Sequence, residues 1–199
     1  MEIKEDIEIW NHCLVDDLWI YDKLILSKKL GYICGPKGVE VPKPDWYITR
    51  PITNLLGMGI GSKIVWIEKY TDEIPDGFFW SEVFVGKHLS VDYVDQKQVL
   101  CVEGFRDEHS PTWKWKEWRK VQETFKYPKI CRELKGNYKN INIEMIDGNI
   151  IEVHLRLNPD WKEDYSSIIP YFEGDIFKIP DGYRYVEDQD YKRIGFYVK

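Results

Sequence analysis

Residues 142–156 read NIEMIDGNIIEVHLR and consist of two apolar runs on either side of an Asp-Gly dipeptide. Alternating apolar and polar residues with a turn dipeptide between them predict an antiparallel β-hairpin. Side chains two positions apart in a strand point to the same face, so Glu152, His154 and Arg156 share one face of the second strand. The hairpin therefore presents an acid, an imidazole and a guanidinium side by side.

The length of the loop decides whether the acids of the two strands meet. A two-residue Asp-Gly loop, which turn statistics favour, turns Glu144 to the face opposite Glu152. A three-residue loop that ends at Asn149 would instead place Glu144 beside Glu152. The same loop would place Asn142 beside His154. Two converging carboxylates repel each other unless they share a proton or a cation such as Mg²⁺. The hairpin is thus either a metal site or an ordinary solvated strand face.

The bulk composition indicates a folded, acidic protein. Of the 199 residues, 43% are hydrophobic and 15% are aromatic, which is enough for a packed core, and the net charge is −6. Because no overall positive charge attracts phosphate backbones, nonspecific nucleic-acid binding is disfavoured. The sequence contains no alanine, which indicates a biased base composition such as that of an AT-rich or viral genome.

The four cysteines form no CxxC pair, and they are Cys13, Cys34, Cys101 and Cys131. We expect reduced thiols, as in a cytoplasmic protein, and no zinc site. The first residues are acidic and lack the apolar segment of a signal peptide. No apolar run approaches the roughly 20 residues that a membrane-spanning helix needs. We therefore expect a cytoplasmic protein with no membrane partner.

The periodicity of apolar residues predicts the order of the elements. A helix is expected over residues 16–30, with acids in its first turn, lysines in its last turn and Gly31 behind it. Residues 113–136 are predicted to be helical in parts, and the tail to hold loops with one or two short strands. Strands are predicted at 45–51, 63–70, 78–86, 87–94, 98–104 and in the hairpin over 141–156. This order indicates an α+β fold with mostly antiparallel sheets.

A glycine-rich loop over residues 54–62 separates two of the predicted strands. Its glycines allow backbone N–H groups to approach a phosphate closely, and its candidate residues are Gly57, Gly59, Gly61 and Ser62. A strand follows the loop, whereas the Walker and dinucleotide-binding loops both need a following helix. The loop is therefore either a phosphate-covering flap between antiparallel strands or a plain turn that is rich in glycine.

A second mixed segment, TWKWKEWRK, covers residues 112–120 and interleaves tryptophan with lysine and arginine. Such a segment can be a stacking platform for a nucleotide or a single strand. It can also be an amphipathic segment whose tryptophans pack inward beneath the lysine stems. The acidic chain favours the second interpretation and makes a nucleic-acid partner the less favoured one.

The order of these pieces, over roughly residues 22 to 160, resembles the ATP-grasp superfamily. Asp22-Lys23 and the loop behind it look like the stretch that leads to the family's strand ending in Lys-Pro. In this chain that strand ends in Arg50-Pro51, so Arg50 stands where the family has a phosphate-binding lysine. A guanidinium also binds phosphate, with a different geometry. The glycine loop matches the family's flap, which implies nucleotide contacts by Lys23, Arg50 and the flap residues.

Residues 81–92, SEVFVGKHLSVD, are similar to the family's linker and next strand, E-x-F/Y-I-x-G-x-E-x-S-V-D. The resemblance implies that the backbone of Glu82, Val83 and Phe84 binds adenine. It also implies that His88 takes the place of the acid that binds the ribose.

The end of the hairpin is similar to the family's metal-binding motif E-x-N-x-R. Glu152 and Arg156 match it, and His154 stands in place of the asparagine. The metal acid of the earlier strand would be Glu144, or Asn142 in its stead. His154 would be a metal ligand or a hydrogen-bonding relay.

The resemblance implies an ATP-grasp-like two-lobed fold. Its N-terminal lobe would cover residues 1–85 with the flap, and its C-terminal lobe residues 86–199 with the hairpin and the tail. The family usually has a separate domain before residue 20 that supplies part of the acceptor site, and this chain has little sequence there.

The activity implied by the resemblance is an ATP-dependent ligase with ATP and Mg²⁺ as cofactors. A small-molecule or peptide carboxylate would become an acyl phosphate, and an amine or thiol would then displace the phosphate. Arg50 and Arg156 would stabilise the charge on the transferred phosphoryl group. The alternative is a non-catalytic protein that keeps the fold and binds a nucleotide or a partner.

Overall fold

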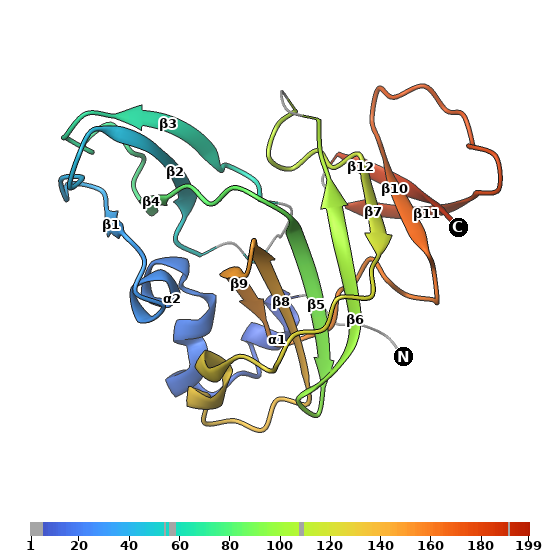
Figure 1. Ribbon diagram of the computed structural model, residues 1–199, viewed down its shortest axis with the longest axis horizontal. Helices are drawn as coiled ribbons and strands as arrows, with labels where there is room; N and C mark the ends of the chain where they lie inside the picture. The colour runs from blue at the N-terminus through green and yellow to red at the C-terminus, as the bar shows by residue number, and fades with distance from the viewer. Residues whose placement is uncertain (1–5, 54, 56–58, 108–109, 191) are drawn as a thin grey trace.

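The computed structural model describes residues 6–53, 55, 59–107, 110–190 and 192–199 and contains two antiparallel sheets (Figure 1). The first sheet has the strand order β1 (Cys34–Pro36), β4 (Phe78–Glu82), β2 (Asp45–Pro51) and β3 (Lys63–Ile67). The second has the order β11 (Arg184–Asp190), β12 (Arg193–Val198), β10 (Ser167–Phe172), β7 (Glu117–Lys120), β6 (Lys97–Phe105), β5 (His88–Val94), β8 (Asn140–Ile146) and β9 (Asn149–His154). The prediction of an α+β fold with mostly antiparallel sheets is therefore confirmed.

The helices are short, and they are α1 (Asp6–Trp10), η1 (Val15–Tyr21), α2 (Lys23–Lys29) and η2 (Lys129–Glu133), where η marks a 3₁₀-helix. The helix predicted over 16–30 is divided at Asp22, whose extended backbone interrupts it. The Asp22 side chain accepts a hydrogen bond from the backbone N–H of Ile25 at 2.8 Å, so Asp22 is the N-cap of α2. Gly31, with a φ of 80°, follows the end of the helix as predicted.

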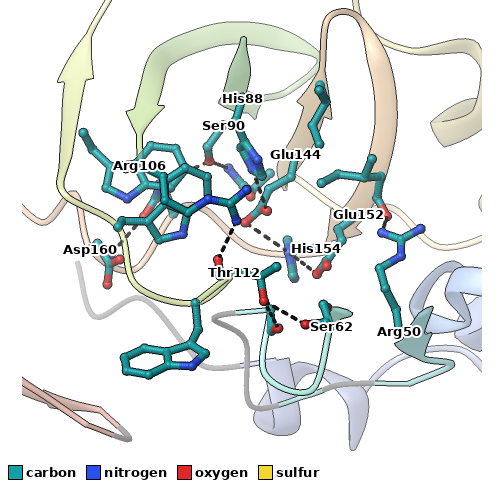
Figure 2. A pocket seen from close by; sticks show the side chains of 18 of the residues that line it. Arg50, Ser62, His88, Ser90, Arg106, Thr112, Glu144, Glu152, His154 and Asp160 are labelled. Atoms are coloured by element: carbon teal, nitrogen blue, oxygen red, sulfur yellow. Dashed lines mark hydrogen bonds and ion pairs between the residues drawn. The ribbon is translucent and has the colours of Figure 1, made fainter. Parts of the chain in front are cut away.

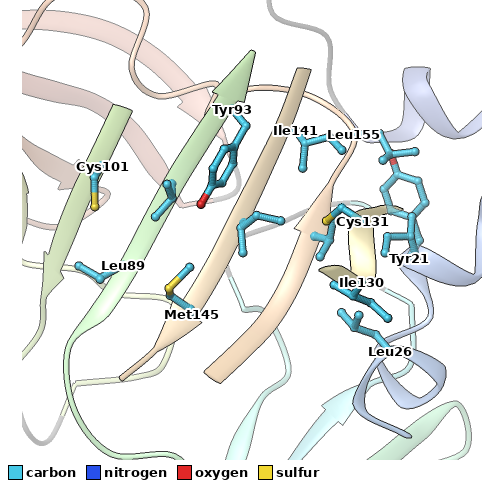
Figure 3. Packing of buried hydrophobic residues seen from close by; sticks show 14 residues of the cluster. Tyr21, Leu26, Leu89, Tyr93, Cys101, Ile130, Cys131, Ile141, Met145 and Leu155 are labelled. Atoms are coloured by element: carbon cyan, nitrogen blue, oxygen red, sulfur yellow. The ribbon is translucent and has the colours of Figure 1, made fainter. Parts of the chain in front are cut away.

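The main core lies between the helices and one face of strands β5, β8 and β9 (Figure 3). Alternate residues of the strands point into it, and Ile141, Ile143 and Val91 are at most 1% exposed. Tyr21 of η1 and Leu26 of α2 cover these residues from the helical side. The opposite face of the same strands therefore remains available for polar side chains.

Two predictions about the C-terminal half were incomplete. Residues 113–136 contain strand β7 and only one short helix, η2, because alternating aromatic and charged residues suit a strand that pairs with β6 and β10. The tail forms three strands, β10 to β12, instead of loops with one or two strands. These strands enlarge the second sheet, and they bury Ile168, Phe196 and Val198 in a core of their own.

The cysteines are free thiols, as predicted, and Cys101 and Cys131 are buried. Burial raises the pKa of Cys131 to about 12, so this thiol is unreactive at neutral pH. No helix in the described part of the chain is long and apolar enough to cross a membrane.

Candidate functional site

The turn of the β8–β9 hairpin has two residues, as the dipeptide predicts. Asp147 and Gly148 have φ values of 48° and 81°, and Ile146 pairs directly with Asn149. Two successive positive φ values are typical of the hairpin turn that Asp-Gly favours. With this turn alone, the acids of the two strands would point to opposite faces.

A β-bulge reverses that outcome. The pairing continues from Met145 with Ile150 to Glu144 with Glu152, so Ile151 is an extra residue without a partner across the hairpin. An extra residue in one strand shifts the side-chain alternation by one position. Glu144 therefore lies directly beside Glu152, which is the arrangement expected from a three-residue loop, although the loop has two residues.

These side chains face a cavity of about 210 Å³ between the two sheets (Figure 2). Most of the predicted site residues line it, and they are Arg50, Gly59, Ser62, Glu82, Val83, Phe84, His88, Glu144, Glu152, His154 and Arg156. Gly61 and Lys23 do not line it. Gly57 lies outside the described residues. The cavity thus collects residues from the strand β2, the linker after β4 and the hairpin.

The carboxylates of Glu144 and Glu152 are surrounded by nitrogen atoms. Lys23 Nζ lies 2.6 Å from Glu152 Oε1 in a buried ion pair, and His88 Nε2 lies 3.3 Å from Glu144 Oε2. His154 Nε2 faces both acids, at 3.9 Å from Glu144 and 3.6 Å from Glu152. Burial acts to raise the pKa of Glu144, but His88 and His154 outweigh it and lower this pKa to about 2. Glu144 is therefore ionised at neutral pH.

The other side of His154 is held by Asp6 of helix α1. One oxygen of Asp6 lies 2.8 Å from His154 Nδ1 and accepts a hydrogen bond from Arg156 Nη2 at 2.7 Å. Burial opposes ionisation of Asp6, but these two cations outweigh it and lower its pKa to about 2. Burial likewise acts to lower the pKa of His154, and the charge of Asp6 reverses this effect and raises it. Both nitrogens of the imidazole are thus directed at carboxylates, which favour its protonated form.

The arrangement bears on the predicted metal site. Within the described ranges, no group of three His, Cys, Asp or Glu side chains is arranged to hold a metal ion. Glu152 is engaged by Lys23, and a protonated His154 has no lone pair for a metal. The three side chains meet as the hairpin predicted, but Glu144, Glu152 and His154 do not fit a resident Mg²⁺ in this arrangement.

Arg50 is a buried cation of the cavity that forms no ion pair with any of the described residues, although the charges of Glu152 and Glu144 act on it from farther away. It is 5% exposed, and Nη1 donates to the carbonyl of the bulge residue Ile151 at 3.3 Å. Its Nε has no hydrogen-bond partner, and in the described part of the chain Arg50 forms no ion pair. The guanidinium lies over the ring of Phe79 at 5.1 Å. Burial lowers the pKa of Arg50, because a charged group is less stable away from water.

Sequence reasoning missed the aromatic wall of the cavity. Trp115 and Trp118 pack edge-on against His88, with ring centroids 4.6 Å and 5.6 Å away. Gly104 pairs with His88 across β5 and β6, and a Cβ there would lie 2.8 Å from both indole rings. The alternation of tryptophan and lysine was the available signal. The tryptophans do point inward, but they reach the cavity as well as the core.

The loop after β9 and the loop before β7 complete the wall. Thr112 Oγ1 donates to the carbonyls of Gly59 and Ser62, at 3.3 Å and 3.1 Å, and so connects the glycine loop to the second sheet. Asp160 lines the cavity beyond the hairpin and forms an ion pair with Arg193 of β12 at 3.0 Å. These contacts join segments far apart in sequence, so no local sequence motif predicts them.

Solved structures with a similar fold include two that superpose over 90% of this chain. One, described as an ATP-grasp superfamily protein from Archaeoglobus fulgidus, superposes with a TM-score of 0.52 and 17% identity over 90% of this chain and 64% of its own. The second is carboxyaminoimidazole ribonucleotide synthase from Aspergillus clavatus in complex with ATP. It superposes with a TM-score of 0.53 and 12% identity over 90% of this chain and 68% of its own.

No protein-family model and no curated protein matches the sequence. The chain spans 64% of the length of the archaeal structure, so the likeness concerns the fold. The fold is ATP-grasp-like, as the order of motifs predicted.

Proposed function

We propose that this chain, with its ATP-grasp-like fold, binds ATP in the cavity between the sheets and uses it to join a carboxylate to an amine or a thiol. The observation that carries the proposal is Arg50, a buried guanidinium without an acidic partner among the described residues. A charge that is out of water needs a counter-charge. In this cavity the counter-charge would come from a ligand, and the planar guanidinium suits a phosphate.

The linker supports the same placement of the nucleotide. Val83 and Phe84 lie between β4 and β5 and outside the strand pairing, so their backbone groups are available to an adenine edge. Glu82 anchors the linker instead, because its side chain accepts from the N–H of Ile33 at 2.9 Å. His88 comes next along the wall and would contact the ribose. Arg50 and the backbone at Gly59 and Ser62 would then meet the phosphates.

The proposed chemistry has two steps. A carboxylate oxygen of the substrate attacks the γ-phosphorus, and ADP leaves, which forms an acyl phosphate. The nitrogen or sulfur of the acceptor then attacks the acyl carbon, loses its proton, and phosphate leaves. Arg50 stabilises the charge on the transferred phosphoryl group, and Arg156, held by Asp6, adds positive potential at the edge of the cavity. Mg²⁺ enters with the substrate as MgATP and neutralises phosphate oxygens.

The carboxylate substrate and the acceptor are small molecules or peptides, and the protein acts in the cytoplasm, where ATP is abundant. An acyl phosphate formed in the cavity between the sheets would be partly sheltered from bulk water, which would otherwise hydrolyse it.

Calorimetry with ATP tests the proposal through Arg50→Met, which keeps the length of the side chain and removes its charge. We expect ATP affinity to fall about 10- to 100-fold, because a charge-assisted hydrogen bond contributes about 1.5–3 kcal/mol. Arg50→Lys should recover part of the loss. Arg119→Met is the matched control, since Arg119 is exposed on β7 and pairs with Glu117. Without ATP, Arg50→Met should lower stability by no more than about 1.5 kcal/mol, the net contribution of its hydrogen bond to Ile151, because Arg50 forms no ion pair with the described residues.

Two outcomes separate the ligase from its alternative. Wild-type protein with no measurable affinity for MgATP contradicts the proposal as a whole. Wild-type protein that binds ATP but releases no phosphate with a panel of carboxylates and amines is the non-catalytic nucleotide-binding protein.

A further inference from the structure

The four oxygen atoms of the paired carboxylates each face a nitrogen atom of another side chain. Lys23 Nζ contacts Glu152 Oε1 at 2.6 Å, and His88 Nε2 lies 3.3 Å from Glu144 Oε2. The two remaining oxygens, Glu144 Oε1 and Glu152 Oε2, face the same atom, His154 Nε2, at 3.9 Å and 3.6 Å. The inner edge of the hairpin is therefore surrounded by side-chain nitrogens.

We propose that Lys23 and His154 supply, from the protein itself, the positive charge that a resident metal ion would supply between Glu144 and Glu152. Two carboxylates side by side need about two positive charges. An ammonium and an imidazolium provide them, so the nucleotide-free site has no need of a divalent cation. This inference concerns the protein alone and does not depend on ligase activity.

The surroundings of Lys23 keep its ammonium group at Glu152. The residue is 5% exposed, and it lines a small cleft together with Glu152 and His154 but does not line the main cavity. A metal ion bound to both oxygens of Glu152 would displace the ammonium and leave it buried without a counter-ion, and one bound to Oε2 alone would lie against His154. Such an uncompensated charge is strongly unfavourable, and the Lys23 contact therefore competes with any metal.

Asp6 keeps His154 in its position between the two acids. The Asp6 carboxylate at Nδ1 fixes the ring, which directs Nε2 at the gap between Glu144 and Glu152. A ring with acids at both nitrogens favours protonation of both, and a protonated nitrogen cannot bind a metal. An asparagine at this position would offer a carbonyl oxygen instead, which Mg²⁺ accepts as a ligand. His154 therefore places a positive charge where an asparagine would offer a ligand to the metal ion.

The test is a titration of nucleotide-free protein with Mn²⁺, which replaces Mg²⁺ and is detected in its free form by electron paramagnetic resonance. Wild-type protein should show no tight stoichiometric site. The double variant Lys23→Met, His154→Asn leaves both acids uncompensated and should bind Mn²⁺ at least about 10-fold more tightly, the smaller of the usual effects of groups around a metal. Adding Glu152→Gln to the double variant should abolish the gain.

Lys29→Met is the matched control, because Lys29 lies on the same helix α2 and pairs with Glu133 at 2.6 Å far from the cavity. Its Mn²⁺ affinity should equal that of the wild type. Circular dichroism establishes that each variant is folded, and His154→Asn alone carries the comparison if Lys23→Met does not fold. A tight Mn²⁺ site in the wild type, or a folded double variant without any gain, overturns the proposal. Neither result bears on ATP binding, which calorimetry with MgATP measures separately.

Discussion

Replacing Asp6 by asparagine should destabilise the protein strongly at neutral pH and much less in acid. Asp6 is 1% exposed, and one of its oxygens serves both His154 and Arg156. Asparagine keeps the shape and removes the charge, so two buried cations lose their counter-ion. Breaking a buried ion pair in this way costs about 3–5 kcal/mol. For a chain of this size, the melting temperature should fall by about 6–20 °C.

The pKa shifts of Asp6 and His154 determine in which direction stability changes with pH and over which pH range. Lowering a carboxyl pKa from 3.8 to about 2 corresponds to about 2–3 kcal/mol of stabilisation. Because the folded pKa lies below the unfolded value, this stabilisation is present above about pH 4 and is lost as the pH falls toward 2. His154 acts in the opposite direction, since its raised pKa adds stability below about pH 6.5 that is lost at higher pH.

Urea unfolding followed by tryptophan fluorescence at pH 7 and at pH 2.5 measures both effects. The difference between the wild type and Asp6→Asn should shrink by about 2 kcal/mol between these conditions. Asp16→Asn, at an exposed acid in the neighbouring helix η1, is the matched control and should change stability by less than about 0.5 kcal/mol at either pH. A difference of equal size at both pH values would refute the reasoning, because it would show that the Asp6 charge is not what stabilises the site.

Two further predictions concern glycines that hold the walls of the cavity in place. Gly86→Ala should cost about 1–3 kcal/mol, because φ is 140° there and the new Cβ would lie 2.6 Å from Asp147 Cβ in the hairpin turn. Combining it with Asp147→Gly should recover part of the loss in urea unfolding, and independent, additive effects would contradict the proposed clash. Gly104→Ala should displace Trp115 and Trp118 from His88, lower stability by about 1–3 kcal/mol and change the near-ultraviolet circular dichroism of the tryptophans. An unchanged spectrum with unchanged ATP affinity would show that the aromatic wall does not depend on this close approach.

Much of the fold follows from local patterns in the sequence. Strands β2, β3 and β4 and the β8–β9 hairpin lie where alternation and turn residues predict them, because strand faces and turn dihedrals depend on near neighbours. Strand β1 of the first sheet was not predicted. The tail and residues 113–136 were misjudged, because their strands are stabilised by partners that are distant in sequence, as when β10 pairs with β7. The strand propensity of local residues does not predict such long-range pairings.

For the candidate site, too, some features follow from the sequence and others only from the tertiary structure. The sequence by itself determined which chemical groups are available, and the spacing of Glu152 and His154 placed them on one face of a strand, whereas Arg156 lies two residues beyond the end of β9. Tertiary structure decided how those groups are paired. The bulge at Ile151 brought Glu144 beside Glu152, although the Asp-Gly turn alone would have separated them. Lys23 contacts Glu152 instead of the cavity, and Asp6 holds His154 across nearly the whole chain. The physical reason is that alternation and turn geometry act over a few residues, whereas the charge state and partners of a buried group depend on whatever the fold packs against it.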